Sequence, residues 1–295
     1  MKRISVIIPC YNDPAGLEMT LESLKRQSLS SDFFEIIVGN DGSSSEVKNV
    51  CDIFNVACVD ISPRGGISVA RNRAIAKSSC DFLAFTDADV SADKDWLLSG
   101  LKALEEHIYV GGKIIVDIKG KNKIFNYYEY LTLFNNREAI SKKYCIGANF
   151  FIRKECFLKT DGFNENFFCG AEDLEFGVRF CDFFRIKPFY CEEAIIFHPA
   201  DKDLNGILNK LTRNRESSRF LYELYPKRFS NLKQGILKPF KIFLIHPLNV
   251  LRSSQEIKST IKIKVFFWSF YLGFLDSLNY IKNRIKNKQY YDFFK

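Results

Sequence analysis

The 295-residue chain is 46% hydrophobic and 26% charged, which is enough apolar sequence for a well-formed core and excludes a mainly disordered protein. Glycine and proline are too few for a collagen-like or low-complexity chain, and the absence of a long repeat excludes a solenoid. The formal net charge is +8, and residues 231–295 account for it, because they hold 12 Lys and Arg against 3 Asp and Glu.

Short apolar runs alternate with amphipathic segments over about the first 200 residues, which is typical of an α/β protein with strands buried on both faces. The pattern predicts strands at 6–8, 35–38, 57–61 and 81–85 and helices at 17–27 and 68–77. Ligands of open parallel sheets bind beyond the carboxyl ends of the strands, so the polar residues that follow these strands should share one rim. They are Asn12, Asp13, Asp41, Arg64, Asp87 and Asp89.

The pattern beyond residue 90 is less regular. It predicts strands at 109–118, 145–152 and 194–197, and helices that begin at Trp96 and span 124–137, 172–184 and 204–225. We therefore expect an α/β domain over residues 1–225 and a helical, basic and aromatic extension over residues 226–295.

Asp-x-Asp tripeptides occur three times, at 87/89, 93/95 and 201/203. Two carboxylates one residue apart at a strand end can face one bound cation, and loop acids can also cap the helix that follows. Only 87/89 directly follows a buried apolar strand, whereas 93/95 precedes the helix expected at Trp96 and 201/203 lies in a turn. Asp87 and Asp89 are therefore the candidate metal ligands.

Charged residues at two helices give further candidates. Glu172 and Asp173 stand at an expected helix start, where acids are favoured electrostatically and can also serve in catalysis. Arg71 lies in the helix after Gly65-Gly66, where it can neutralise a phosphate group or pair with the carboxylates of the rim. Both interpretations are open for each site.

Histidines and glycine-rich motifs narrow the function. His198 ends an expected strand and is either a metal ligand or a structural residue, whereas His107 and His246 are interpreted as structural. Neither Gly-x-x-x-x-Gly-Lys-[Ser/Thr] nor a Gly-x-Gly-x-x-Gly after the first strand occurs, which disfavours ATPases, kinases and NAD enzymes. The first strand is followed by Pro9-Cys10-Tyr11-Asn12 in place of the glycine-rich loop of sugar nucleotidyltransferases.

Seven segments, in order, resemble the inverting family-2 glycosyltransferases, which have the GT-A fold. They are 6–12 (VIIPCYN), 38–43 (VGNDGS), 65–89, which ends in FTDAD, 147–149 (GAN), 161–165 (DGFNE), 170–173 (GAED) with Arg179, and 198–199 (HP). The resemblance covers about residues 3–200 and leaves the tail after about Pro226 unmatched. It implies a mostly parallel central sheet flanked by helices.

The resemblance also implies roles for the matching residues. The residues expected to bind the nucleotide sugar are Pro9, Tyr11, Asn12, Asp41, Arg71, Asp87 and Asn149. Asp41 is expected to contact the nucleobase. Metal binding is expected of Asp89, Asp87 and His198. Catalysis is expected of Asp173 as the base and of Glu172 beside it on the acceptor side.

The implied activity is transfer of a sugar, with inversion, from a nucleotide sugar, expected to be UDP-linked, to a hydroxyl of a saccharide or lipid-linked glycan in bacterial polysaccharide assembly. Mn²⁺ or Mg²⁺ would neutralise the leaving diphosphate, and a carboxylate would take the hydroxyl proton. The helix start is expected to lower the pKa of Asp173 and keep it ionised. The alternative is a catalytically inactive, glycosyltransferase-like scaffold at a membrane.

The tail has one apolar stretch, residues 265–275, about half of the ~20 residues that cross a bilayer. Lysines and arginines flank it at Lys262, Lys264, Lys282, Arg284, Lys286 and Lys288. The tail should therefore either bind an anionic membrane surface or form a helix packed on the domain or in a dimer interface.

Cysteine usage indicates the compartment. Nine cysteines without a Cys-x-x-Cys pair, and no signal peptide at the start of the sequence, favour a reduced cytoplasmic protein, either free or peripheral on the inner face of the cell membrane. We expect no nucleic-acid partner, and a homo-oligomer stays open.

Overall fold

The computed structural model describes residues 4–118, 124–201, 203–232, 238–253 and 257–285. Within them the chain forms two compact units, an N-terminal unit of residues 4–115 and 135–199 and a C-terminal unit of residues 116–134 and 200–285. The C-terminal unit is thus built from two separate stretches of chain. The domain boundary expected between residues 225 and 226 stays a prediction, and the structure groups residues 200–225 with the helices that follow.

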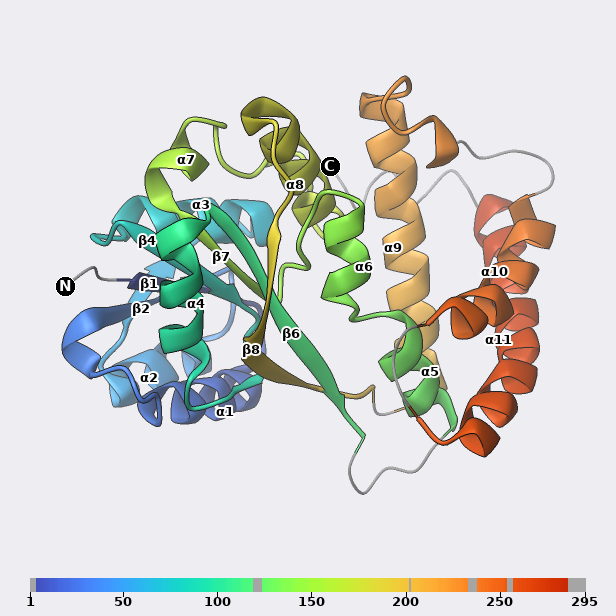
Figure 1. Ribbon diagram of the computed structural model, residues 1–295, viewed down its shortest axis with the longest axis horizontal. Helices are drawn as coiled ribbons and strands as arrows, with labels where there is room; N and C mark the ends of the chain where they lie inside the picture. The colour runs from blue at the N-terminus through green and yellow to red at the C-terminus, as the bar shows by residue number, and fades with distance from the viewer. Residues whose placement is uncertain (1–3, 119–123, 202, 233–237, 254–256, 286–295) are drawn as a thin grey trace. The chain divides into compact units, whose positions relative to one another are not determined.

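The N-terminal unit is built on one sheet whose described strands run in the order β3-β2-β1-β4-β7-β6-β8-β5 (Figure 1). Strands β1 to β4 are parallel, whereas β7 is antiparallel to β4 and β6, and β5 is antiparallel to β8. The sheet is therefore of the α/β kind expected from the sequence. The strand bounds are β1 Ile4–Cys10, β2 Phe34–Asn40, β3 Ala57–Asp60, β4 Phe82–Thr86, β5 Ser91–Ala92, β6 Tyr109–Asp117, β7 Asn149–Arg153 and β8 Phe189–Pro199.

The carboxyl ends of the central strands meet at one edge of this sheet. Ile7 is level with Ile37 on one side and with Phe85 on the other, so β1, β2 and β4 end close together. Strand β7 starts at the same edge, because Asn149 is paired with Thr86. The loops after β1, β2 and β4 therefore collect beside the segment that precedes β7.

Helices flank the sheet, and α8 has the bounds that the sequence predicted. The long helix predicted over 124–137 is instead divided, because the side chain of Asn135 accepts a hydrogen bond from the backbone N–H of Glu138 and caps a new helix. Seven helices are assigned to the N-terminal unit: α1 Pro14–Lys25, α2 Ser45–Phe54, α3 Ile67–Lys77, α4 Trp96–Glu106, α6 Asn136–Ser141, α7 Lys154–Leu158 and α8 Glu172–Phe184.

The strand predicted over 145–152 starts later, at Asn149. The backbone N–H of Cys145 donates to the hydroxyl of Tyr109, and that of Ile146 donates to the side chain of Asn136. Side chains thus satisfy backbone groups that a strand would have paired, and residues 145–148 form a connection beside the rim.

Aromatic rings fill the core between the sheet and α8. The rings of Phe85 and Phe150 are stacked, with centroids 4.1 Å apart and planes 10° apart. The ring of Phe176, on α8, has its centroid 5.0 Å from those of both Phe157 and Phe163. All five residues are buried, so this cluster fixes α8 and its N-terminus against the sheet.

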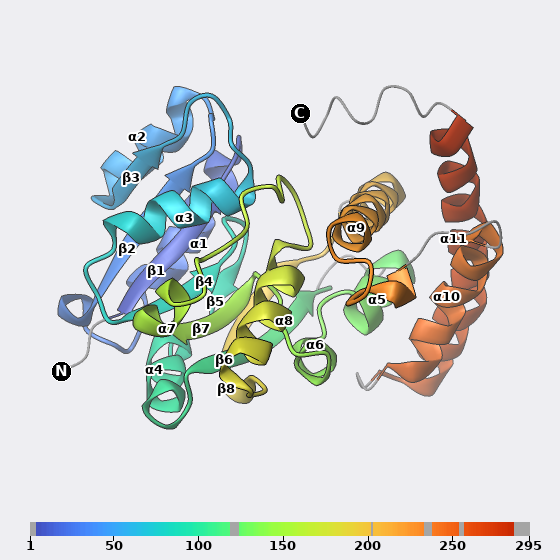
Figure 2. The same cartoon turned by 90° about the horizontal axis from the view of Figure 1, so that it is seen from above.

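The C-terminal unit is helical in its described parts (Figures 1 and 2). Its helices are α5 Ile124–Thr132, α9 Leu204–Leu224, α10 Lys238–Arg252 and α11 Ser259–Ile285. Apolar side chains from all four helices form its core, which comprises Tyr128, Leu131, Ile207, Val250, Val265 and Leu272. The helical extension expected from the sequence is present.

A buried polar chain runs through this helical core. Tyr128 hydroxyl and His246 Nδ1 lie 2.6 Å apart, His246 Nε2 lies 3.1 Å from Asp276 Oδ2, and Arg215 Nη1 donates to Asp276 Oδ1 over 2.7 Å. His246 thus has structural partners within the unit. Among the described residues, no helix is both long and apolar enough to cross a membrane.

The aromatic cluster predicts a large stability effect. Phe150→Ala removes a fully buried ring and should lower the free energy of unfolding by about 3–5 kcal/mol. Phe183→Ala is the matched control, since its ring is 60% exposed, and it should change the value by less than about 0.5 kcal/mol. Urea unfolding followed by circular dichroism gives both numbers, and equal effects would contradict this role of the cluster.

Candidate functional site

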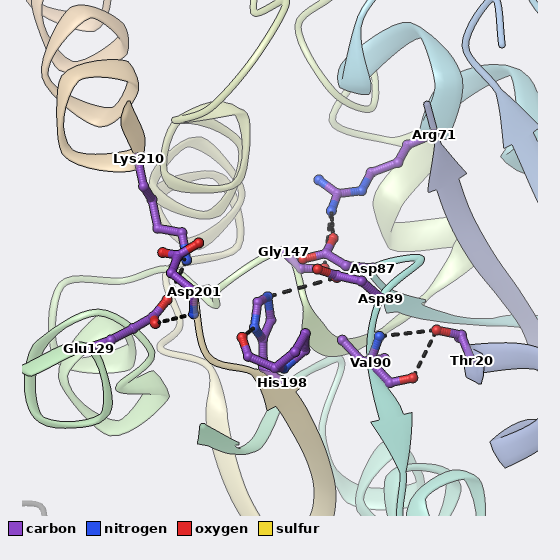
Figure 3. A network of polar contacts seen from close by, with 11 residues as sticks. Thr20, Arg71, Asp87, Asp89, Val90, Glu129, Gly147, His198, Asp201 and Lys210 are labelled. Atoms are coloured by element: carbon purple, nitrogen blue, oxygen red, sulfur yellow. Dashed lines mark hydrogen bonds and ion pairs between the residues drawn. The ribbon is translucent and has the colours of Figure 1, made fainter. Parts of the chain in front are cut away.

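Two strand ends bring three metal-ligand side chains together. Asp87 and Asp89 lie in the turn after β4, while His198 lies near the end of β8 (Figure 3). One ligand atom from each of the three lies within 4.8 Å of the others. Strand β5 pairs with β8, with Ser91 level with Phe197. This pairing places the turn after β4 beside His198.

The turn itself is held by α1. Thr20 hydroxyl donates to the carbonyl of Val90 over 2.8 Å and accepts from the N–H of Val90 over 3.0 Å (Figure 3). Both residues are fully buried, so the backbone after Asp89 has a fixed position. The carboxylates are therefore presented by a rigid support.

The orientation of His198 suits metal binding. Its Nδ1 lies 2.8 Å from the carbonyl of Pro199, and its Nε2 lies 3.9 Å from Asp89 Oδ1. A carbonyl accepts only, so Nδ1 carries a proton, and Nε2, on the side of Asp89, is the ring nitrogen that could bind a metal. Two carboxylates and one imidazole form a donor set that fits a divalent cation such as Mn²⁺.

Arg71 stands at the centre of the neighbouring cluster. The side chain is only 1% exposed, and its guanidinium donates to Glu172 Oε1 over 2.7 Å, to Asp87 Oδ1 over 3.2 Å and to the carbonyl of Gly147 over 3.2 Å. A side chain at Gly147 would put its Cβ 2.7 Å from Arg71 Nη2, so glycine is needed there. Arg71 pairs with the rim carboxylates, one of the two roles considered from the sequence.

Glu172 is buried and paired rather than open to an acceptor. Its Oε1 accepts from Arg71, and its Oε2 is buried and makes no hydrogen bond in the structure. Its position at the start of α8 is as expected, but its charge serves the cluster with Arg71. A direct role for Glu172 in catalysis stays a prediction.

Asp173 is the carboxyl with the perturbed proton affinity. Oδ2 accepts from the N–H of Gly147 over 2.8 Å, and Oδ1 accepts from the N–H of Leu174 over 2.7 Å. Burial of the carboxyl, followed by the charge of Glu172, raises the pKa of Asp173 from 3.8 to about 7. The expectation that the helix start lowers this pKa was wrong, because desolvation and a neighbouring like charge outweigh the two N–H bonds.

Asp41 organises the loop that precedes α3. Its Oδ1 accepts from the N–H groups of Gly65 and Gly66 over 2.7 and 3.0 Å, and Arg64 Nε donates to its Oδ2 over 3.2 Å. Gly66 has φ +89°, and a Cβ there would lie 2.5 Å from the carbonyl of Phe168. The carboxylate expected at a nucleobase is thus already engaged with the chain's own loop.

The planar guanidinium of Arg64 lies close to two aromatic rings beside Asp41. The guanidinium carbon of Arg64 is 3.5 Å from the ring centroid of Tyr11 and 4.6 Å from that of Phe168. The Tyr11 side chain is exposed, as a stacking surface for a ligand would be. Arg64 therefore covers the surface that was expected to receive the nucleoside.

The match to a known family settles the relationship. Residues 5–160 match the family model described as Glycosyl transferase family 2, which is more than half of the chain. The chain belongs to glycosyl transferase family 2. The recognition from the sequence motifs is thereby confirmed.

Two similar proteins have names that describe them as glycosyltransferases. Glycosyltransferase AglE of Haloferax volcanii is 27% identical over 184 residues, which are 57% of this chain and 58% of AglE. The GalNAc(5)-diNAcBac-PP-undecaprenol beta-1,3-glucosyltransferase of Campylobacter jejuni is 26% identical over 209 residues, 66% of this chain and 63% of the relative. The chain thus spans about three fifths of the length of these two relatives.

A solved structure shares the fold. The mannosyltransferase PcManGT from Pyrobaculum calidifontis, in complex with GDP-Man and Mn²⁺, matches with a TM-score of 0.65 at 14% identity, covering 97% of this chain and 88% of that one. At this identity the match concerns the fold alone. It confirms the GT-A fold expected of this family-2 chain.

The remaining residues expected at the donor have mixed surroundings. Asn12 holds the loop after β2, since its N–H donates to the hydroxyl of Ser43 and its side chain accepts from the N–H of Ser44. Pro9 lies within β1, level with Gly39. The predicted donor contacts of Asn12 and Pro9 remain predictions.

Asn149 is enclosed by protein. Its Oδ1 accepts from Trp96 Nε1 over 2.8 Å, and its Nδ2 donates to the carbonyls of Lys113 and Ala194. It is fully buried, and these bonds tie β6, β7, β8 and α4 together. Asn149 thus has a structural role, and the donor contact that the resemblance implied stays a prediction.

Sequence reasoning did not assign a role to Phe168 and placed Arg64 only on the rim. Phe168 belongs to no motif. It lies in a loop about a hundred residues after Arg64 in the sequence and contacts Arg64 only in the folded chain. The only signal was Gly65-Gly66, whose glycines permit the close approach of the 168 backbone. Asp13, also placed on the rim, caps α1 by accepting from the N–H of Gly16.

The raised pKa of Asp173 predicts pH-dependent stability. Because the folded-state pKa is about 7 and the ordinary value is 3.8, the folded chain binds the proton more tightly, and stability falls as pH rises between these values. Asp173→Asn should remove this fall. As the pH rises from about 5 to about 8, the difference in the free energy of unfolding between variant and wild type should shift in favour of the variant by roughly 1–3 kcal/mol.

Asp52→Asn, at an exposed position of α2, is the control and should keep a constant offset from wild type. Urea unfolding at several pH values provides the comparison. An Asp173→Asn offset that is equally constant would contradict the raised pKa.

Proposed function

We propose that this chain transfers a sugar, with inversion, from a nucleotide sugar to a hydroxyl of a saccharide or lipid-linked glycan, using Mn²⁺ or Mg²⁺. The observation that carries the proposal is the cluster of Asp87, Asp89 and His198 at the sheet rim of a family-2 chain. The mannosyltransferase PcManGT is described with GDP-Man and Mn²⁺, and TarS of S. aureus with UDP-GlcNAc. For this chain we propose a UDP-linked donor.

Asp87, Asp89 and His198 would hold the cation. A bound divalent cation supplies neutralisation of the charge that develops on a diphosphate leaving group. Asp87 also binds Arg71, so a fixed positive charge lies next to the carboxylates on the side away from His198 (Figure 3). This guanidinium supports the orientation of Asp87 and adds positive potential where a diphosphate would lie.

The nucleoside would occupy the corner of Tyr11, Asn12 and Asp41, beside Pro9. A base is planar, as the guanidinium of Arg64 is, and it would stack on the exposed ring of Tyr11. Arg64 would then move aside and leave a lone pair of Asp41 Oδ2 for a base N–H, next to the N–H of Gly66, which lies 3.1 Å from the same oxygen. Gly65 and Gly66 would keep the other oxygen engaged.

Asp173 would act as the general base. Its pKa of about 7 matches the requirement that a base be ionised at neutral pH and still accept a proton well. The N–H groups of Gly147 and Leu174 hold the carboxylate in place and leave lone pairs for an acceptor hydroxyl. A single displacement at the anomeric carbon, with the hydroxyl proton passing to Asp173, inverts the configuration.

A catalytically inactive scaffold is the competing proposal. Arg71 already compensates Asp87 and Glu172, so these two carboxylates would be tolerated in a chain that binds no cation. Donor hydrolysis without acceptor separates the two proposals, because an active transferase loses some donor to water. Release of UDP from a panel of UDP-sugars in the presence of Mn²⁺ is expected, and its absence for every donor favours the scaffold.

We include in the proposal a cytoplasmic setting at the inner face of a bacterial membrane, in polysaccharide assembly. The basis is that none of the nine cysteines is in a disulfide, together with the basic tail. A homo-oligomer stays open.

Metal dependence gives one prediction. Asp89→Ala removes a carboxylate of the cation cluster, so turnover should fall by at least ~10²-fold, and EDTA should abolish turnover of the wild type until Mn²⁺ is restored. Asp95→Ala is the matched control, since Asp95 belongs to another Asp-x-Asp tripeptide and its side chain makes no cap hydrogen bond. Near-native turnover of Asp89→Ala would remove the metal assignment.

The base assignment gives another prediction. Asp173→Asn should lower kcat by ~10²-fold or more while donor affinity, measured by calorimetry, changes little. For the wild type, kcat/KM should fall about tenfold per pH unit below about pH 7, because the free enzyme's base becomes protonated.

Asp52→Asn again serves as the control, and proton NMR of the product linkage reports the stereochemistry. Retained configuration, or a fall of kcat by only a few-fold, would exclude Asp173 as the base of a direct displacement.

A further inference from the structure

The outer face of α11 carries an uninterrupted row of apolar side chains. Every exposed residue of this helix between Lys264 and Lys282 is aliphatic or aromatic. Together with the residue just before Lys264 they form the α11 stripe, which consists of Ile263, Phe267, Tyr271, Phe274, Leu278 and Ile281. Steps of four, four, three, four and three residues average the 3.6-residue period of about one turn, so the stripe runs straight along the helix for about 27 Å.

The core of the C-terminal unit does not use the stripe. Val265, Ser269 and Leu272 are fully buried on the opposite face, and the ring of Trp268 packs against Tyr128, with centroids 6.0 Å apart. Residues 265–275 form one apolar stretch in the sequence, and the structure exposes only Phe267, Tyr271 and Phe274 of this stretch. The stripe is thus left over after the unit has folded.

Helix α10 packs beside α11 (Figure 2). The two helices approach closely at Gly273, where a Cβ would lie 2.4 Å from the carbonyl of Phe243. Ile245, Leu248 and Leu251 are exposed on α10. An exposed apolar row as long as the α11 stripe marks an interaction site in a globular protein.

The charges of α10 and α11 favour an anionic partner. Exposed cations stand on both helices, Lys241 and Arg252 on α10 and Lys264 and Lys282 on α11. Asp276 is the only acid in the described parts of these two helices, and it is buried against Arg215. A second copy placed on this face would bring cations against cations, whereas an anionic surface complements them.

We propose that the α11 stripe lies in the headgroup layer of an anionic lipid bilayer, with the helix axis along the membrane plane. The aromatic and aliphatic side chains enter the boundary with the acyl chains, and Lys264 and Lys282 meet lipid phosphates. Of the other flanking cations expected from the sequence, Lys286 and Lys288 lie outside the described residues. This inference extends the peripheral membrane setting of the proposed function by naming the contact surface.

The test is co-sedimentation of the full chain with vesicles. Wild type should bind vesicles of phosphatidylcholine mixed with phosphatidylglycerol, and binding should weaken in high salt and on phosphatidylcholine alone. The combined variant Phe267→Gln, Phe274→Gln and Leu278→Gln should lower the partition coefficient at least ~tenfold, because three inserted side chains become polar. All three positions are exposed, so the core is unchanged.

Two further variants complete the design. Ile53→Gln with Phe183→Gln changes exposed apolar residues of α2 and α8 in the same way and should bind as wild type does. Lys264→Gln with Lys282→Gln should weaken binding to anionic vesicles and reduce its salt dependence. Circular dichroism of every variant verifies the fold.

Two results would overturn the inference: absence of wild-type binding to anionic vesicles, or equal partition of the stripe variant and wild type. A stripe variant that converts a dimer into a monomer in analytical ultracentrifugation, with vesicle binding unchanged, would assign the face to self-association. Vesicle binding requires no turnover, so its outcome is independent of whether sugar transfer is detected.

Discussion

One buried guanidinium holds the candidate site together. Arg71 extends from α3 and bonds to Glu172 at the start of α8, to Asp87 after β4 and to the carbonyl of Gly147 before β7. Removal of one partner from such a buried arrangement typically costs several kcal/mol, so the four segments are fixed relative to one another. Burial of the carboxyl, followed by the charge of Glu172, raises the pKa of Asp173, and the charge of Arg71 lowers it without cancelling these two effects.

The fold could be predicted largely because its strands are short apolar runs and α8 opens with acids. Two of the predicted element boundaries were wrong because side chains satisfy backbone N–H groups there. Residues 145–148 leave the strand pattern because Tyr109 and Asn136 satisfy their N–H groups, and a single asparagine side chain at residue 135 separates α5 from α6. The bond to Tyr109 joins residues 36 positions apart, which no local pattern connects, whereas the Asn135 cap acts on a residue only three positions further on.

The rim of the site could also be predicted, since parallel strands collect their following loops at one edge. Which residues of the rim pair with one another could not be predicted. Arg71 and Glu172 are 101 residues apart, and the packing of α8 against the core, in which Phe176 takes part, brings them together. The sign of the pKa change at Asp173 failed for a related reason: a helix start favours the anion, but burial beside a second carboxyl opposes it more strongly.

The division of the C-terminal unit into two stretches has a consequence for biosynthesis. Residues 116–134 leave the ribosome long before α9, α10 and α11, so the apolar face of α5 waits without the partners that later bury Tyr128 and Leu131. The N-terminal sheet can pair completely during this interval, since its last strand ends at Pro199. A chain that stops at the end of the sheet would leave α5 as a permanent apolar appendage, and such a fragment is therefore prone to aggregation.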